Sequence, residues 1–246
     1  MSDHDDRRST SALGSPGSPG WAARIQELRA IEPSPRRLAL FGVADAIRVV
    51  LHRMVQTSAP IDVIEAAATD VGAAAERLGA YTSKSMYEGF AEAANAGEPF
   101  GFFDHSPMLG RANPLAPPIE LWLEGDRIFG TATFGSAYEG PPGCVHGGYI
   151  AAAFDEVLGS TQSLSGAPGM TGRLTVHYRS PTPLRTELHF EGWIDRVEGR
   201  KIFTLGELRA DDVLCAEAEG LFISIDLSKF ASMKAERDRR EAVDAD

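Results

Sequence analysis

Hydrophobic positions recur with two different periods along the chain, and the change of period divides the sequence in two. After a polar start of about 20 residues and up to about residue 97, apolar residues return every three or four positions, as on one face of an α-helix. From Pro118 onward they alternate with polar residues, as in a β-strand with one buried face. The pattern predicts a helical first part and a sheet-forming second part, separated by a loop dense in Pro and Gly over residues 97–118.

Helical spacing predicts three segments in the first part. Residues 36–55 carry apolar side chains at helical spacing and are expected to form one helix. Residues 58–80 are rich in alanine, and Ser58 ahead of Pro60 is expected to cap this helix and open its first turn. A third candidate covers residues 83–97.

The second part of the chain is read as two strands, one helix and four further strands. Residues 119–134 give two strands around a Gly-Asp turn, and the helix follows after the segment YEGPPG. The remaining strand candidates are residues 170–179, 184–196, 200–209 and 213–225. The short turns VEGR and ADDV make the strands that they join antiparallel. The expected fold class is α+β, with a single antiparallel sheet built around one helix.

These patterns divide the chain into four segments. Residues 1–20 contain two GSP repeats and are expected to be a disordered tail, because they offer nothing to bury. Residues 21–110 are expected to be a helical N-terminal extension, and residues 111–228 the domain that contains the sheet. Residues 229–246 are expected to be a polar C-terminal tail.

The start of the helix in the second part has a composition that suits chemistry. The sequence CVHGGYIAAAFDEVLG, residues 144–159, places Gly147 and Gly148 in the first turn. The first N–H groups of a helix have no internal partner, and without side chains a ligand oxygen can approach them closely. Such a turn can hold an anion, or a carbonyl oxygen that becomes one during reaction. Alternatively, the glycines relieve crowding against the sheet.

Asp155 interrupts the apolar run of the same helix. Burial of a lone carboxylate is costly enough to shift its pKa or to require a partner. No basic residue lies three or four positions away on either side. Two interpretations are open: Asp155 is a functional carboxylate, or it lies with Glu156 on a narrow solvent-facing stripe.

The spacing between the glycines and Asp155 has a further consequence. Eight residues of helix from Gly147 to Asp155 span ~12 Å. One carbonyl group within hydrogen-bond reach of both would allow only ~6 Å. If both act on the same carbonyl, they come from two copies of the chain, and a symmetric dimer contains two such sites.

Alternation assigns faces to the strand that follows the helix. Leu174, Val176 and Tyr178 are expected on one face. The other face is expected to carry a hydroxyl and several cationic or titratable groups, namely Thr171, Arg173, Thr175, His177 and Arg179. This second face is either functional or an ordinary solvated strand face.

Charge and cysteine usage narrow the classes of protein. The 24 Lys and Arg against 35 Asp and Glu give a net charge of −11, which argues against general affinity for nucleic acid or anionic membranes. Cys144 and Cys215 lack CxxC spacing, so neither a disulfide framework nor a structural zinc site is expected. No apolar run approaches the ~18–20 residues of a membrane span, and the polar start lacks the features of a signal peptide. A cytoplasmic protein is expected.

Three segments together resemble a known family. VHGGYIAAAFDEVLG, MTGRLTVHYRSPTPL and VEGRKIF, in this order, resemble the hotdog-fold acyl-CoA thioesterases, in particular the PaaI-like branch that includes the thioesterase superfamily members. The resemblance covers about residues 118–226. It implies an antiparallel sheet wrapped around a long central helix, working as a homodimer or a dimer of dimers. The helical N-terminal extension has no counterpart in a minimal domain of this family.

The resemblance also implies roles for individual residues. Gly147 and Gly148 would supply the N–H groups for an oxyanion, with His146 shaping that first turn. Asp155 would be the catalytic carboxylate, either as a general base or as a nucleophile. Thr171 would position water or the carboxylate.

Four basic or titratable residues match positions with which the family holds coenzyme A: His177, Arg179, Arg200 and Lys201. Guanidinium groups suit phosphates because they bind them bidentately. For Arg200 and Lys201 the alternative is an ordinary solvated hairpin turn.

The resemblance implies an acyl-CoA thioesterase that converts a fatty or related acyl-CoA to the free acid and coenzyme A. The expected partners are the acyl-CoA and a second copy of the chain, with sites at the subunit interface. No separate cofactor or metal is implied, because coenzyme A is part of the substrate. The alternatives are a non-catalytic acyl-CoA-binding protein of the same fold and, ranked last, an enoyl-CoA hydratase.

Overall fold

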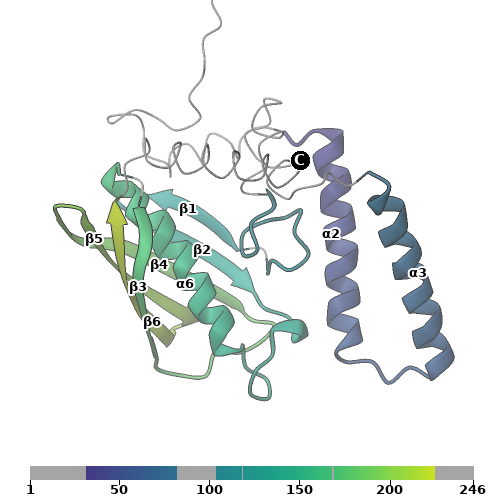
Figure 1. Cartoon of the computed structure of the whole chain (residues 1–246). Coiled ribbons are helices and arrows are strands. Elements are labelled where there is room, and N and C mark those ends of the chain that lie inside the picture. The colour runs from purple at the N-terminus through teal and green to yellow at the C-terminus, as the bar shows by residue number, and fades with distance from the viewer. Residues whose placement is uncertain (1–31, 82–103, 118, 168, 225–246) are drawn as a thin grey trace, which may run out of the picture. The chain divides into compact units, whose positions relative to one another are not determined.

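The computed structural model describes residues 32–81, 104–117, 119–167 and 169–224. They fall into two compact units, which are described separately (Figure 1). One unit contains Glu32–Pro118 and Phe134–Tyr138, and the other contains Ile119–Thr133 and the chain from Glu139 onward. The tail expected over residues 1–20, the helix expected over residues 83–97 and the tail expected over residues 229–246 lie outside the described residues.

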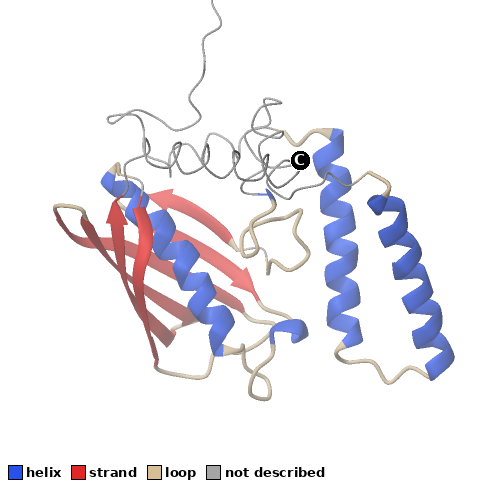
Figure 2. Cartoon of the chain, in the orientation of Figure 1, coloured by secondary structure: helices blue, strands red, loops and turns tan. Residues whose placement is uncertain are grey.

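The second unit contains a six-stranded antiparallel sheet within the described residues, in the order β1-β2-β4-β5-β6-β3 (Figure 2). The strands are β1 Glu120–Glu124, β2 Arg127–Thr133, β3 Gly169–Tyr178, β4 Glu187–Glu198, β5 Lys201–Ala210 and β6 Val213–Ser224. Each predicted strand is present to within a few residues. Gly199 and Asp211 have positive φ values of 59° and 50° in the tight turns on either side of β5. β3 lies at one edge of the sheet.

Helix α6, Gly147–Gln162, packs against one face of this sheet (Figure 1). Phe154 and Leu158 are fully buried between the helix and the strands, and Phe154 meets Phe190 of β4 edge to face. The close approach depends on glycines of the sheet: a Cβ atom at Gly206 would lie 3.0 Å from the Leu158 side chain. An antiparallel sheet around one helix confirms the predicted α+β class and the hotdog arrangement.

We expect Leu158→Ala to lower the free energy of unfolding by about 3 kcal/mol, because it leaves a cavity between α6 and the sheet. Denaturant unfolding of the full chain measures this change. The matched control is Val197→Ala in β4, where the side chain is 52% exposed and the cost should stay below about 0.5 kcal/mol. Equal effects of the two substitutions would contradict the packing.

The first unit contains helices α2, Pro35–Met54, and α3, Ile61–Gly79. Both fall where helical spacing predicted them. Ser34 caps α2, since its side chain accepts a hydrogen bond from the Arg37 N–H. The predicted Ser58 cap of α3 is wrong. Pro60 occupies the cap position with an extended backbone (ψ 160°), so the helix begins after it and Ser58 lies outside.

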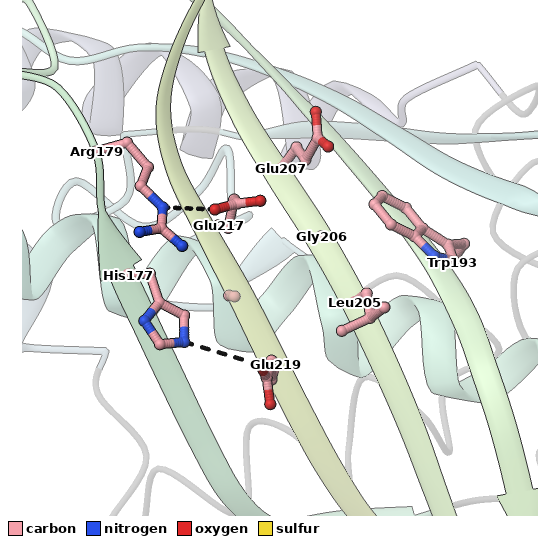
Figure 3. Close-up of a pocket in the computed structure, with 9 residues that line it drawn as sticks. His177, Arg179, Trp193, Leu205, Gly206, Glu207, Glu217 and Glu219 are labelled. Carbon is pink, nitrogen blue, oxygen red and sulfur yellow. Dashed lines mark hydrogen bonds and ion pairs between the residues drawn. The ribbon is translucent and has the colours of Figure 1, made fainter.

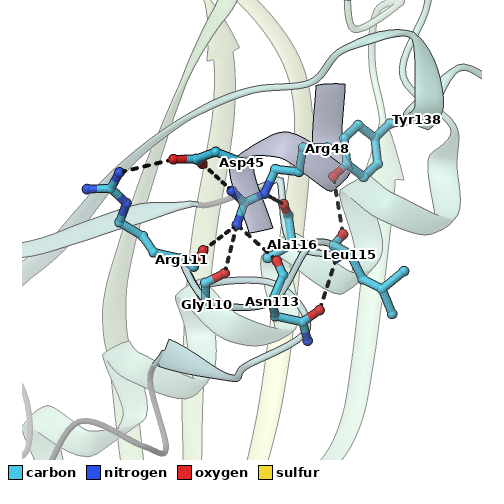
Figure 4. A network of polar contacts seen from close by, with 8 residues as sticks. All are labelled: Asp45, Arg48, Gly110, Arg111, Asn113, Leu115, Ala116 and Tyr138. Atoms are coloured by element: carbon cyan, nitrogen blue, oxygen red, sulfur yellow. Dashed lines mark hydrogen bonds and ion pairs between the residues drawn. The ribbon is translucent and has the colours of Figure 1, made fainter. Parts of the chain in front are cut away.

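A buried arginine organises the loop of residues 104–117 in this unit (Figure 4). Arg48 of α2 is 8% exposed and donates hydrogen bonds to the backbone carbonyl groups of Gly110, Arg111, Asn113 and Ala116, at 2.7–3.2 Å. Its charge is paired with Asp45, one turn earlier in the helix. A planar guanidinium with five N–H donors can satisfy several carbonyl groups at once, which an ammonium group cannot do in the same geometry.

We expect Arg48→Lys to destabilise this loop, because several buried carbonyl groups lose their donor while the charge is kept. Thermal unfolding should show a loss of about 2 kcal/mol, and limited trypsin digestion should cut faster after Arg111. Arg36→Lys, at an exposed position of the same helix, is the control. Unchanged cleavage at Arg111 in the Arg48 variant would contradict the role of Arg48 in holding the loop.

Candidate active site

The first turn of α6 is closed by the residue that precedes it. His146 occupies the N-cap position, and its Nδ1 accepts a hydrogen bond of 3.0 Å from the Gly148 N–H. Its carbonyl oxygen accepts from the Tyr149 N–H at 2.9 Å. Within the described residues, the Gly147 N–H has no hydrogen-bond acceptor. Of the two amides expected to hold an oxyanion, one is thus capped by an imidazole and the other is open.

Tyr178 also belongs to this turn, although sequence reasoning did not single it out. Its hydroxyl, on edge strand β3, donates to the Gly147 carbonyl oxygen at 2.8 Å. A Cβ atom at Gly147 would lie 3.2 Å from that hydroxyl oxygen, and one at Gly148 would lie 3.1 Å from the His146 Nδ1. The glycines therefore do relieve crowding, and the neighbours are these two side chains.

Asp155 and Thr171 form the second part of the site. Asp155 lies on the side of α6 that faces β3, and its Oδ1 accepts a hydrogen bond of 2.9 Å from the Thr171 hydroxyl. Both residues are exposed in the single chain, while Glu156 is partly buried. The carboxylate is therefore on the surface of the chain, held by a hydroxyl group from a neighbouring strand.

A β-bulge decides which side of β3 Thr171 occupies. Thr171 pairs with Phe222 of β6, and Arg173 pairs with the adjacent Leu221, so Gly172 is an extra residue. The predicted placement of Thr171 on one face with His177 and Arg179 is wrong for this reason. Thr171 lies on the α6 side together with Tyr178, as the contacts of both side chains show. The signal that could have revealed the bulge is the glycine inside a strand pattern.

His177 and Arg179 line a shallow groove of about 160 Å³ on the opposite face of the sheet (Figure 3). The Arg179 Nε donates to the Glu217 carboxylate at 2.6 Å, and the His177 Nε2 lies 3.8 Å from the Glu219 carboxylate. Carboxylates therefore already accompany both residues. Within this chain, the structure does not bring them to Asp155, and their predicted contact with coenzyme A stays a prediction.

Arg200 and Lys201 lie at the β4–β5 hairpin, as expected. The Arg200 side chain donates two hydrogen bonds to the Ser224 carbonyl oxygen at the end of β6, at 3.1 and 3.0 Å. Ser224 is paired with Gly169, where β3 begins, so Arg200 marks the end of the sheet at which Thr171 lies. Both basic residues are exposed. The solvated-turn interpretation and the predicted contact with coenzyme A both remain open.

The described part of the chain has few other reactive groups. Cys144 is partly buried, Cys215 is buried, and both are free thiols. No three His, Cys, Asp or Glu side chains of the described residues are close enough together to ligate a metal ion.

None of the described helices combines the length and the apolar composition needed to cross a membrane.

The chain is similar in sequence to known thioesterases. A family model described as the thioesterase superfamily matches residues 142–217. The acyl-coenzyme A thioesterase THEM4 of Xenopus laevis is 39% identical over 93 residues, which are 37% of this chain and 42% of that protein. The acyl-coenzyme A thioesterase THEM5 of Homo sapiens is 29% identical over 97 residues, or 39% of each chain. The matched segment thus spans about two fifths of the curated relatives.

A solved structure extends the similarity beyond this segment. The crystal structure of a thioesterase superfamily protein is 34% identical to this chain, with a TM-score of 0.65. The alignment covers 75% of this chain and 94% of that one. The sheet, the central helix and its glycine turn define a hotdog-fold protein. The chain belongs to the thioesterase superfamily.

We expect His146→Ala to lower the free energy of unfolding by about 1 kcal/mol, because the Gly148 N–H loses its acceptor. His146→Asn should keep stability to within about 0.5 kcal/mol, since asparagine is among the best N-cap residues. Denaturant unfolding of both variants measures the difference. Equal losses in the alanine and asparagine variants would show that the cap hydrogen bond contributes nothing.

Proposed function

We propose that this protein hydrolyses acyl-CoA thioesters to a free acid and coenzyme A, with a fatty or related acyl group as substrate and the cytoplasm as its compartment. The observation that carries the proposal is the 2.9 Å hydrogen bond from Thr171 of β3 to Asp155 of α6. The same helix begins with Gly147 and Gly148. Among the described residues, the partner of this carboxylate is a neutral hydroxyl and not a cation, so no ion pair competes with the substrate for it. The curated relatives are acyl-coenzyme A thioesterases by name.

Asp155 acts on the thioester carbon in one of two ways. As a general base, it removes a proton from water while the water oxygen forms a bond to the acyl carbon. As a nucleophile, it forms that bond itself and water then cleaves the anhydride. In both routes the C–S bond breaks, the water oxygen ends in the free acid with Asp155 regenerated as a carboxylate, and a proton from that water ends on the coenzyme A thiolate. Thr171 holds Oδ1 and thereby leaves Oδ2 for the reaction.

The developing negative charge on the thioester oxygen requires hydrogen-bond donors. The Gly147 N–H is the first donor in our proposal, because it has no acceptor among the described residues and lies at the positive end of α6. The Gly148 N–H contributes when the oxyanion shares it with His146.

A complete site in this proposal needs two chains. Gly147 and Asp155 are separated by ~12 Å of helix, and one thioester carbonyl reaches both only if they belong to different protomers. β3 offers a place for association, because it is an edge strand of ten residues with Met170 55% and Tyr178 54% exposed. A two-fold dimer along β3 and the exposed side of α6 would create two identical sites. We propose this homodimer, alone or paired into a tetramer.

Coenzyme A brings several phosphate charges to a protein with a net charge of −11. In the proposal, Arg200 and Lys201 meet those charges, because they are exposed at the end of the sheet where Thr171 lies. His177 and Arg179 contribute only if phosphate replaces Glu217 and Glu219 as their partner.

We expect Asp155→Asn to reduce hydrolysis by at least about 10³-fold with the fold intact, since the amide can neither accept the proton nor attack. Release of free thiol from short, medium, long and aromatic acyl-CoAs measures the activity. Asp126→Asn, in the exposed β1–β2 turn, is the control and should keep wild-type rates. Full activity of the Asp155 variant would overturn the role of this residue. Binding of acyl-CoA by the wild type without thiol release would favour the non-catalytic binder.

The same assay tests whether the site is shared between chains. Gly147→Val is expected to disturb the first turn of α6 in one chain, because its Cβ atom would lie 3.2 Å from the Tyr178 hydroxyl oxygen and would displace it. The Gly147→Val and Asp155→Asn chains are mixed in equal amounts and refolded together. About half of the dimers are then heterodimers, each with one intact site of two, so about a quarter of wild-type activity should return. No recovery, despite heterodimer formation seen by mass spectrometry, would show that one chain forms the whole site.

A further inference from the structure

A single peptide group in the first turn of α6 is hydrogen-bonded at both ends. The Gly147 carbonyl and the Gly148 N–H belong to the same peptide unit. Its oxygen accepts from the Tyr178 hydroxyl at 2.8 Å, and its N–H donates to the His146 Nδ1 at 3.0 Å. Tyr178, the peptide and His146 therefore form one continuous chain of hydrogen bonds.

This chain determines the protonation pattern of the imidazole. Nδ1 can accept a hydrogen bond only when it carries no proton, so a neutral His146 ring has its proton on Nε2. Donation by Tyr178 to the carbonyl polarises the peptide and strengthens its N–H as a donor, because hydrogen bonds in series reinforce one another. A property of Tyr178 is thus transmitted to the ring of His146 through the peptide and not through a direct hydrogen bond between the two side chains.

The bond between Tyr178 and the peptide is not forced by burial in the single chain. In the single chain, Tyr178 is 54% exposed and His146 is exposed, so water could reach both side chains before any association along β3. Yet each presses on its glycine at a distance that leaves no room for a Cβ atom without displacement. His146 is held from a further side by Tyr149, with the two rings edge to face at 6.5 Å.

We propose that Tyr178 is a positioning residue: by holding the Gly147 carbonyl, its hydroxyl fixes the peptide that keeps His146 in the Nε2–H tautomer. His146 then presents an Nε2–H donor at the same helix start as the open Gly147 amide, suited to the thioester oxygen or to the departing sulfur. This inference rests on the proposed thioester hydrolysis and adds two side-chain groups to it. No covalent step is assigned to Tyr178.

The test combines Tyr178→Phe with ring-nitrogen NMR of the full chain labelled with ¹⁵N, where comparison with His146→Gln identifies the His146 signals. Wild type should show a bare Nδ1 and a protonated Nε2. In Tyr178→Phe this tautomer preference should weaken, and kcat should fall about 3- to 10-fold while KM changes less than about 2-fold. Tyr138→Phe removes a hydroxyl-to-carbonyl bond of 3.2 Å to Leu115 in the other unit, and both readouts should remain those of wild type.

Each outcome decides one question. A protonated Nδ1 in the wild type overturns the inference without any variant, so it remains testable even if Tyr178→Phe does not fold. A lower kcat with an unchanged tautomer overturns the route through the peptide, and so does an unchanged kcat in an active enzyme. If wild type releases no thiol from any acyl-CoA, the proposed function fails, and the NMR measurement still decides whether Tyr178 sets the His146 tautomer.

Discussion

The candidate active site depends on one extra residue in an edge strand. The bulge at Gly172 shifts β3 by one position relative to β6, and this shift turns Thr171 toward α6. Without it, strict alternation would place the hydroxyl on the far face of the sheet, and Asp155 would have no partner on β3. The contact that carries the proposed chemistry is thus a consequence of backbone register.

One face of the central helix α6 packs against the sheet, and the other carries groups of the candidate site. Its buried face is fixed by tight packing of Phe154 and Leu158 over glycines of the sheet, which leaves it no freedom to rotate or slide. The exposed side carries Asp155, and the first turn carries the open amide. Because the buried face sets the position of the helix, the groups at the surface inherit a defined geometry that their own exposure could not supply.

Local signals in the sequence were sufficient to predict the helices and strands, but not to predict the contacts between them. The change of period and the turn residues located the strands, α2, α3 and α6, since these depend on near neighbours. The Ser58 cap failed because Pro60 delayed the start of its helix. Thr171 was assigned to the wrong face because alternation assumes an unbroken strand, and the bond from Tyr178 to Gly147 joins residues 31 positions apart. Asp155 and Gly147 stood out through their unusual place in an apolar helix, and the family resemblance added His146 and the role of each residue.

The buried Arg48 constrains its own position in the sequence more strictly than the positions of the loop that it contacts. It holds the 104–117 loop entirely through main-chain oxygens, and every amino acid supplies such an oxygen whatever its side chain. The Arg48 contacts themselves therefore do not depend on the side chains of the loop, whereas position 48 has no equivalent substitute. Other positions of the loop are constrained on their own account, since a Cβ atom at Gly110 would lie 2.5 Å from the Asp104 and Ser106 carbonyl oxygens, and Asp104 is paired with Arg37. A single change at Arg48 would deprive four carbonyl groups of their donor at once, although they lie more than 60 positions away in the sequence.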